Sequence, residues 1–486
     1  MKHIQRWTVL LLCGMLLLVG AFAEADTEQA ANITKRYAFD FGTYPYAKMR
    51  VLDDPKHYQI FSAQAEITVT WDEPEPGARL CLQWYEPAEG VAVLQYGADG
   101  ALLETAPLAS AASTVTPLNT DARKAVIRAG ETEMKLWNAA VYGAGTLPDP
   151  YHEWLDTPEH LDYLLISTHP DDDVLFLGSV VPTYGAEKGY VGTIVYVTCI
   201  NRERMTEAEN GAWAMGLRYR PLFFGLPDVS RDASQRKKDT FQYDELLLLT
   251  VRAYRQYRPV VVFAQDENGE YGHWQHVLTS RAAREAFALA ADPSYDPESV
   301  ERYGTWQVQK LFLHLYPENE FRIDAHTPLA AFGGKDAYTV AQEAYRKHES
   351  QVRSTGFSVR CDDEKHAFNR FGMAEGTVPL GADVFDNIDP KLLSDYIPPT
   401  PEPTPEPTPE PTPEPTPEPT KEPTAEPTAE PTAAPTAEPS EAPKPEANRP
   451  KVWPWFVIGG AAALIAAILT ARSIRKIKTG ISRGEI

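Results

Sequence analysis

The stretch that decides the fold comprises residues 161–178, which read LDYLLISTHPDDDVLFLG. Residues 161–167 are mostly apolar and have the length of one buried strand, and residues 174–178 are typical of a helix. Between them lies a polar loop with one histidine and three consecutive aspartates. Sites in α/β proteins form just beyond the carboxyl ends of strands, so this loop is the first place to look for chemistry.

Strand and helix patterns alternate along residues 151–397. Strands are predicted at residues 161–167, 191–198, 222–224, 260–264 and 311–315, and helices at residues 205–215, 243–257, 276–291 and 338–349. This alternation favours a Rossmann-like α/β domain, with a parallel sheet covered by helices on both faces.

The segment before it, residues 24–150, has no helical period. Short β-branched and aromatic runs occur at residues 67–71, 80–85, 91–97, 101–104, 124–128 and 134–142. We therefore predict an all-β sandwich accessory domain, a scaffold common among glycan-binding modules. Trp71, Trp84 and Trp137 could stack on sugar rings, but sandwich tryptophans more often fill the core, and we favour the core.

Both ends of the 486-residue chain carry targeting patterns. Residues 1–23 combine a basic start, an apolar run and small residues, as in a secretory signal peptide. Residues 451–471 are long and apolar enough for a transmembrane helix, and the basic tail at residues 472–486 places the C-terminus in the cytoplasm. A buried core helix is the alternative for this run. The two patterns together predict a single-pass cell-membrane protein with an extracellular catalytic domain.

A stalk is predicted at residues 398–450, which repeat Pro-Thr-Pro-Glu and then Pro-Thr-Ala-Glu. Proline at this density favours extended polyproline II. Residues 401–450 hold eleven glutamates against three basic residues, a net −8 of the chain's −22. This acidity is that of a solvated spacer, and it argues against nucleic-acid binding.

The cysteines do not predict disulfide bonds or a metal site. Cys81, Cys199 and Cys361 follow the predicted signal peptide, and no Cys-x-x-Cys pair is present. An odd count without paired spacing predicts neither a disulfide framework nor a cysteine-type zinc site.

The polar loop after the first strand has the residue types of a metal site. His169 and Asp172 stand three residues apart and can bind one ion if the loop turns tightly at Pro170. Neutral imidazole and carboxylate are zinc ligands, and catalytic zinc sites usually have three protein ligands plus water. The alternative is that residues 171–173 only place negative charge at a helix N-terminus.

A second loop follows the strand at residues 260–264 and precedes a helix. It contains His273 and His276, a spacing that on its own is a weak signal. Because both loops follow strands of one predicted sheet, they can lie on the same edge. His276 can then complete the ligand set, and His273 can approach the substrate.

These two loops resemble those of the PIG-L family, also called LmbE-like, of zinc-dependent N-deacetylases. The family's hallmarks are an Ala-His-Pro-Asp-Asp-Glu-type motif and a later Gly-His-Pro-Asp-His-type motif. The resemblance covers roughly residues 162–351, and further matching segments lie at residues 204–207, 214–217, 225–228 and 344–351.

The resemblance implies a role for each matching residue. It implies zinc ligands at His169, Asp172 and His276, a general base at Asp171, an oxyanion-stabilising or proton-donating residue at His273, and sugar contacts at Arg204 and Asp228. The chain departs from the family pattern at Asp173, at Ser167-Thr168 and at Trp274-Gln275. None of these removes an implied ligand or base, but Gln275 removes a negative charge that could tune His273 or His276.

The expected function is therefore Zn²⁺-dependent hydrolysis of the linear amide of N-acetylglucosamine-type sugars, in an envelope or extracellular glycan. One alternative is a zinc amidohydrolase that acts on a non-sugar amide. Others are a non-catalytic glycan-binding surface protein and a structural tether whose important part is the stalk.

Overall fold

The computed structural model describes residues 28–394, except residues 53–56, 88, 200, 229–241 and 362. The predicted signal peptide, stalk, membrane helix and basic tail lie outside the described residues. Within those described ranges, no helix combines the length and apolar character needed to cross a membrane.

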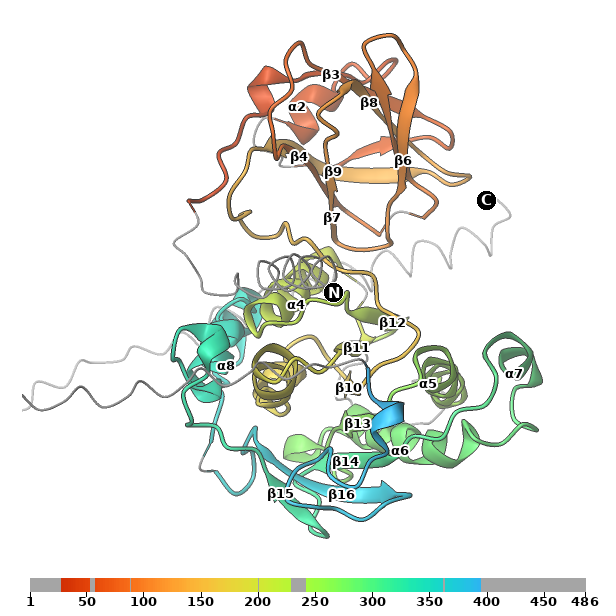
Figure 1. The fold of residues 1–486 in the computed structure, drawn as a ribbon, viewed down its shortest axis with the longest axis vertical. Coiled ribbons are helices and arrows are strands. Elements are labelled where there is room, and N and C mark those ends of the chain that lie inside the picture. The colour runs from red at the N-terminus through yellow and green to blue at the C-terminus, as the bar shows by residue number, and fades with distance from the viewer. Residues whose placement is uncertain are drawn as a thin grey trace, which may run out of the picture. The chain divides into compact units, whose positions relative to one another are not determined.

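The first part of the described chain forms two antiparallel sheets (Figure 1). One sheet has the order β1-β3-β8-β5-β6 and the other the order β2-β9-β4-β7. The strands are β1 (Ala38–Asp40), β2 (Gln59–Phe61), β3 (Glu66–Thr70), β4 (Arg79–Trp84), β5 (Ala92–Gly97), β6 (Leu102–Pro107), β7 (Ser113–Pro117), β8 (Ala122–Arg128) and β9 (Met134–Tyr142). A short helix, α2 (Ala47–Val51), accompanies them.

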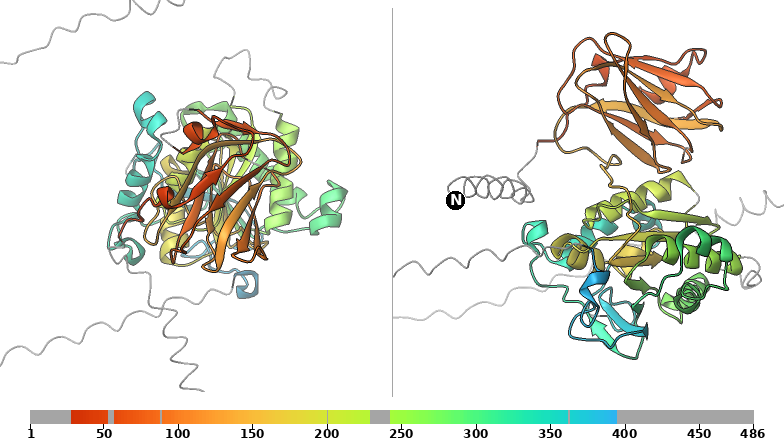
Figure 2. Two further views of the ribbon diagram at one scale, coloured as in Figure 1. Left: turned by 90° about the horizontal axis from the view of Figure 1, so that it is seen from above. Right: turned by 45° about the vertical axis from the view of Figure 1, so that its right-hand side comes forward.

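The two sheets face each other as a sandwich (Figure 2), and alternate side chains of both belong to one buried core. Ile67 on β3 and Leu82 on β4 belong to the same buried cluster. Trp71 and Trp84 are also buried there, so the core prediction is confirmed for both. Trp137 is half-buried and lies outside this cluster.

The second part is built on a seven-stranded sheet of order β12-β11-β10-β13-β14-β16-β15. Its strands are β10 (Tyr163–Ser167), β11 (Gly192–Thr198), β12 (Leu222–Leu226), β13 (Val261–Ala264), β14 (Lys310–His314), β15 (Glu320–Arg322) and β16 (Arg370–Gly376). The first five are mutually parallel, as predicted. β16 runs antiparallel to both β14 and β15, so the expectation of a wholly parallel sheet is wrong at this edge. With two glycines and two charged residues, residues 370–376 carry no strand pattern.

Two separate cores cover the two faces of this sheet. Tyr163 and Leu165 of β10 enter one core, whereas Leu164 and Ile166 enter the other. Side chains of α3 (Asp172–Leu175), α4 (Arg202–Ala214) and α8 (Ala337–Tyr345) join the first core, and those of α5 (Tyr243–Tyr257) and α6 (Trp274–Leu289) join the second. The strand residues point alternately to opposite faces, which explains why these strands are apolar throughout.

Shorter helices complete this part of the chain. They are the π-helix Val181–Glu187, α7 (Pro297–Tyr303), α9 (Glu349–Ser354) and the 3₁₀ turns Glu270–Gly272, Ala330–Phe332 and Pro390–Leu392. The single helix predicted at residues 338–349 is divided into α8 and α9. The break allows the backbone N–H of Ser350 to donate to Glu207 of α4 at 2.6 Å.

Helix α4 also contacts the sandwich through a buried carboxyl group. Glu209 accepts a hydrogen bond from the backbone N–H of Ala112 at 3.1 Å, and its other oxygen has no partner among the described residues. Burial raises the pKa of Glu209 to about 7. The folded chain therefore favours the protonated form of this side chain.

We expect Glu209→Gln to stabilise the protein at pH 8 and to leave its stability unchanged at pH 4. The pKa of Glu209 is raised from 4.5 to about 7 on folding, so wild-type stability falls as pH rises through this window. A shift of that size corresponds to roughly 3 kcal/mol, which the neutral amide avoids. Thermal melting from pH 4 to 8 measures the difference, and the exposed neighbour Glu203→Gln is the control. A pH-independent difference would contradict the assignment.

Candidate active site

Parallel pairing brings the two predicted loops together. Tyr163 of β10 is in register with Val261 of β13, so the loops that follow these neighbouring strands share one edge of the sheet. The His169 Nδ1 atom lies 2.9 Å from Asp172 Oδ2 and 3.0 Å from His276 Nε2. Asp172 Oδ2 and His276 Nε2 are 3.2 Å apart. The three side chains predicted as metal ligands thus converge at one point.

The tautomers of the two histidines suit a metal ion at this point. His276 Nδ1 donates to Glu270 Oε2 at 2.7 Å, so displacement of the Nε2 proton by a metal ion would leave the Nε2 lone pair facing Asp172. His169 Nε2 donates to Gln275 Oε1 at 3.1 Å, which leaves its Nδ1 facing the same carboxylate. Ligands of a tetrahedral ion with bonds of about 2.0–2.2 Å lie roughly 3.3–3.6 Å apart. The two nitrogens and the anionic oxygen, which are 2.9–3.2 Å apart, therefore need to separate only slightly to surround such an ion. The donor set therefore fits a divalent cation.

Charge in the site points to the same conclusion. Burial alone would lower the pKa of His276, but the carboxylates of Asp172 and Glu270 outweigh it and raise that pKa to about 10. Burial would raise the pKa of Asp172, but His276 and His169 hold it well below its usual value. The pocket concentrates negative charge and stabilises a positive charge at its centre.

Sequence reasoning missed the residues that hold His276 in place. Glu270 is buried and accepts from His276 through one oxygen and from His314 Nδ1 through the other, at 2.8 Å. His314 is the last residue of β14, so it lies at the same sheet edge. A polar residue at the end of the strand predicted at residues 311–315 is the signal that could have found it.

Asp171 lies beside the converging ligands in an unusual backbone conformation. Its φ of 128° is one that residues other than glycine rarely adopt, and such strain often marks functional positions. Arg204 donates to its Oδ1 at 2.9 Å and also to the Pro170 carbonyl. Burial and the neighbouring Asp172 charge raise the pKa of Asp171 to about 7, against the opposite effect of Arg204.

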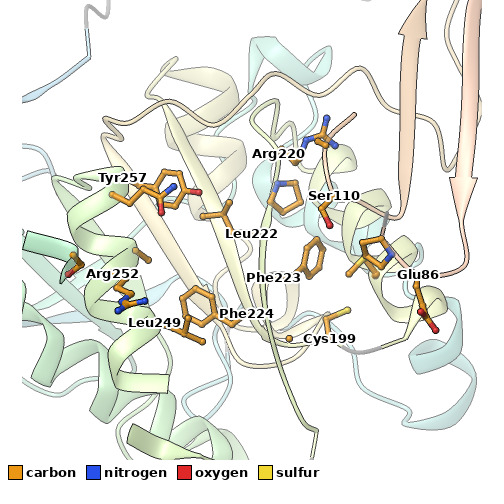
Figure 3. A pocket seen from close by; sticks show the side chains of 18 of the residues that line it. Glu86, Ser110, Cys199, Arg220, Leu222, Phe223, Phe224, Leu249, Arg252 and Tyr257 are labelled. Carbon is orange, nitrogen blue, oxygen red and sulfur yellow. The ribbon is translucent and has the colours of Figure 1, made fainter. Parts of the chain in front are cut away.

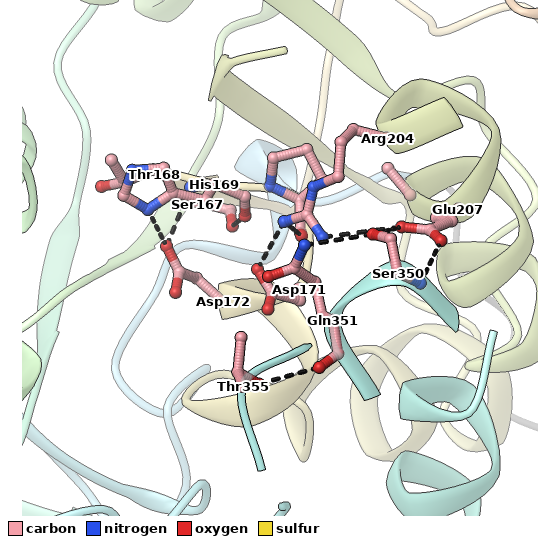
Figure 4. A network of polar contacts seen from close by, with 12 residues as sticks. Ser167, Thr168, His169, Asp171, Asp172, Arg204, Glu207, Ser350, Gln351 and Thr355 are labelled. Carbon is pink, nitrogen blue, oxygen red and sulfur yellow. Dashed lines mark hydrogen bonds and ion pairs between the residues drawn. The ribbon is translucent and has the colours of Figure 1, made fainter. Parts of the chain in front are cut away.

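A polar chain connects Asp171 to helix α9 (Figure 4). Arg204 lies 3.5 Å from Glu207 Oε2, and Glu207 accepts hydrogen bonds from both the backbone N–H and the hydroxyl of Ser350. Asn201 caps the start of α4 by accepting from the Arg204 N–H at 2.9 Å. The position of Asp171 thus depends on the first turn of α4.

His273 is the third member of a histidine cluster. One ligand atom of each of His169, His273 and His276 lies within 4.8 Å of the others, a group that could hold a metal ion. Asp172 Oδ2 lies within 3.2 Å of both His169 and His276, so we regard Asp172 as the better third ligand. His273 then remains beside the ion position, with its ring 4.9 Å from that of His169.

The remaining predicted residues surround this centre. Asp228 is exposed at the rim, with Oδ1 3.6 Å from His169 Nε2, and Arg204 is mostly buried against Asp171. Gln275 contacts His169, so its effect falls there and not on His273 or His276 as predicted. Asp173 is buried and accepts from the Tyr196 hydroxyl at 2.8 Å.

Comparison with known proteins adds a family and several relatives. Residues 164–287 match the family described as PIG-L: GlcNAc-PI de-N-acetylase. The 1D-myo-inositol 2-acetamido-2-deoxy-alpha-D-glucopyranoside deacetylase 1 of Catenulispora acidiphila is 30% identical over 188 residues, which are 32% of this chain and 56% of that protein. The deacetylase 2 of that name from Saccharopolyspora erythraea is 25% identical over 260 residues, 44% of this chain and 93% of that protein. The N,N'-diacetylchitobiose deacetylase structure from Pyrococcus horikoshii covers 39% of this chain and 70% of its own, with 18% identity and a TM-score of 0.31.

Residues 164–287 are therefore a PIG-L family domain, and the resemblance inferred from the two loops is confirmed. The match spans little more than half of the first relative's length. Residues 164–287 include both loops and every residue that the sequence predicts for the site, whereas His314 and Ser350 lie beyond them.

We expect Glu270→Gln to weaken zinc binding about 10–100-fold. The substitution removes the carboxylate that fixes the tautomer of His276, and losses of this size are typical for such supporting groups. Competition with a chromophoric chelator measures the zinc dissociation constant. Glu267→Gln is the matched control, because Glu267 lies in the same loop but pairs with Arg284. Equal zinc affinity in both variants would contradict the role of Glu270.

Proposed function

We propose that the chain is a zinc-dependent hydrolase that removes N-acetyl groups from N-acetylglucosamine-type sugars. The observation that supports it most is the convergence of His169, Asp172 and His276, with Asp171 beside them, inside a PIG-L domain. The names of the relatives support the substrate class, because both act on a 2-acetamido-2-deoxy-glucopyranoside.

In this proposal His169 Nδ1, Asp172 Oδ2 and His276 Nε2 hold the zinc ion. When bound, zinc acts as a Lewis acid that makes water more acidic and polarises a carbonyl group. Glu270 and Gln275 keep the two imidazoles in the ligating tautomer. Burial of the three ligands limits competition from solvent.

Asp171 serves as the general base in the proposed reaction. Its carboxylate takes a proton from the water that attacks the acetamide carbonyl, and Arg204 fixes its orientation through Oδ1. His273 stabilises the negative charge that develops on the carbonyl oxygen. The carbon–nitrogen bond then breaks as the acid form of Asp171 returns its proton to the amine nitrogen. Acetate and a free amino sugar are the products.

The setting of the site remains a proposal from the sequence. A signal peptide at residues 1–23 and a membrane helix at residues 451–471 would place the catalytic domain outside the cell. The acidic proline-rich stalk at residues 398–450 would hold it at a distance from the bilayer. A glycan of the cell envelope or its surroundings is then the accessible substrate.

We expect Asp171→Asn to lower acetate release about 10²–10⁴-fold while zinc content stays unchanged. The amide keeps the shape of the side chain but does not accept the water proton. Acetate release from N-acetylglucosamine oligosaccharides, measured beside zinc content by mass spectrometry, tests this. Glu203→Gln, on the first turn of α4, is the control for charge loss near the site. Equal activity of Asp171→Asn and wild type would reject Asp171 as the base.

Replacement of His273 should separate the oxyanion contact from metal binding. We expect His273→Gln to lower kcat about 10²–10³-fold, with KM and zinc affinity close to wild type. His326→Gln, an exposed histidine in contact with Asp336, is the control. Loss of zinc from His273→Gln would instead make His273 a ligand.

A further inference from the structure

A cavity of about 730 Å³ lies next to the active site and contains none of the proposed ligands (Figure 3). Its walls come from β12, the start of α4, helices α5 and α7, and two loops of the sandwich, near Tyr85 and Ser110. Cavities of about 300–1,000 Å³ are typical of small-molecule sites. The cavity is therefore large enough for a sugar residue.

Two chain segments run from the lining of the cavity to the active site. Asn201 lines the cavity and caps α4, and Arg204, three residues later, holds Asp171. Gly225 lines the opposite wall, and Asp228, three residues later, approaches His169 at 3.6 Å. A molecule that extends from the active site past the first turn of α4 can therefore enter this cavity.

The edge strand β12 divides the cavity into two sides (Figure 3). Phe224 points toward Leu249 and Arg252 of α5, whereas Phe223 points toward Ser110 of the sandwich. We call the second side the sandwich-side lobe and define it by residues that line the cavity there: Tyr85, Ser110, Arg202, Arg220 and Phe223.

Two arginines line the sandwich-side lobe, and none of the described ion pairs joins either of them to a carboxylate. The carboxylates of Glu209 and Asp156 still interact with the charge of Arg220 at longer range, and that of Glu203 interacts with the charge of Arg202. The Nε and NH1 atoms of Arg220 are buried and have no hydrogen-bond acceptor in that part of the chain. Arg202 stacks on Trp137 at 4.0 Å, and Tyr85 stacks on the same Trp137. Glu86 also lines this side of the cavity, and its carboxylate accepts a hydrogen bond from Lys135 at 2.6 Å.

The other side of the cavity is electrically different. Arg252 there is neutralised by Asp296, with contacts of 2.8 and 3.0 Å, and by Glu298 at 3.2 Å. Arg220 and Arg202 both line the sandwich-side lobe, so their guanidinium groups offer an entering anion two charged hydrogen-bond donors.

We propose that the sandwich-side lobe binds an anionic sugar residue of the same glycan chain whose N-acetylated sugar occupies the active site. The identity of that neighbouring sugar rests on the proposed deacetylase function. Arg220 and Arg202 bind the carboxylate or phosphate, and the rings of Tyr85 and Phe223 contact the apolar face of the sugar. The substrate is then an acidic glycan and not a free monosaccharide.

Calorimetry on the full chain tests the lobe directly. With Asp171→Asn, which keeps substrates intact, we expect a hyaluronan tetrasaccharide to bind at least about tenfold more tightly than neutral chitotetraose. Adding Arg220→Gln or Arg202→Gln should abolish this preference, and Arg281→Gln, outside the cavity, should not. Equal binding of both tetrasaccharides, or a preference that persists in both lobe variants, would overturn the proposal. Two separate lobe variants keep the test decisive if one of them fails to fold.

Two further measurements identify the kind of anion that binds and distinguish failure of the anionic lobe from failure of the deacetylase function. Stronger competition by glucuronate than by glucose 1-phosphate supports a carboxylate ligand, the reverse supports a phosphate ligand, and competition by neither overturns the anionic site. With Asp171 intact, Arg220→Gln should leave kcat/KM for a single N-acetylglucosamine unit unchanged. Absence of acetate release from every sugar, together with Arg220-dependent binding, would reject the deacetylase and retain the anionic lobe.

Discussion

The parallel pairing of β10 with β13 is the constraint on which the site depends. Register between Tyr163 and Val261 places the ends of both strands at one edge, so the loops that follow them adjoin. The strands are apolar throughout because both of their faces are buried. This pairing is what brings Asp172 Oδ2 and His276 Nε2, which belong to different loops, within 3.2 Å of each other.

Buried charged side chains determine which ligands this edge of the sheet can bind. Asp172 and Glu270 are both fully enclosed carboxylates, and each is compensated by histidines. Burying such groups is unfavourable unless each has its partner, which ties His276 and His314 to fixed positions. The same arrangement leaves two imidazole lone pairs and one carboxylate oxygen facing a common point. A divalent cation bound there would relieve the repulsion among these donors.

Elements with a strong hydrophobic pattern can be predicted from the sequence. Elements and side chains whose positions depend on tertiary contacts cannot. β10 and α5 were predicted within two residues, because one is uniformly apolar and the other strongly amphipathic. β16 was missed, since Arg370–Gly376 pairs antiparallel with both β14 and β15 but has no hydrophobic pattern. Glu270 was missed because its loop holds three acids, Asp266, Glu267 and Glu270, and nothing in their spacing shows which one faces His276. The loss of charge at Gln275 was expected to act on His273 or His276, but the side chain contacts His169, and the sequence does not show which side of the α6 start it faces.

The first turn of α4 connects three parts of the molecule. Arg204 faces the active site and holds Asp171, Arg202 faces the sandwich and stacks on Trp137, and one turn further Glu209 accepts from Ala112. A displacement of the sandwich would therefore be transmitted to α4, and from α4 to the proposed base. The sandwich thus has a physical connection to catalysis even if it never contacts the acetamide, because it supports the helix that orients Asp171.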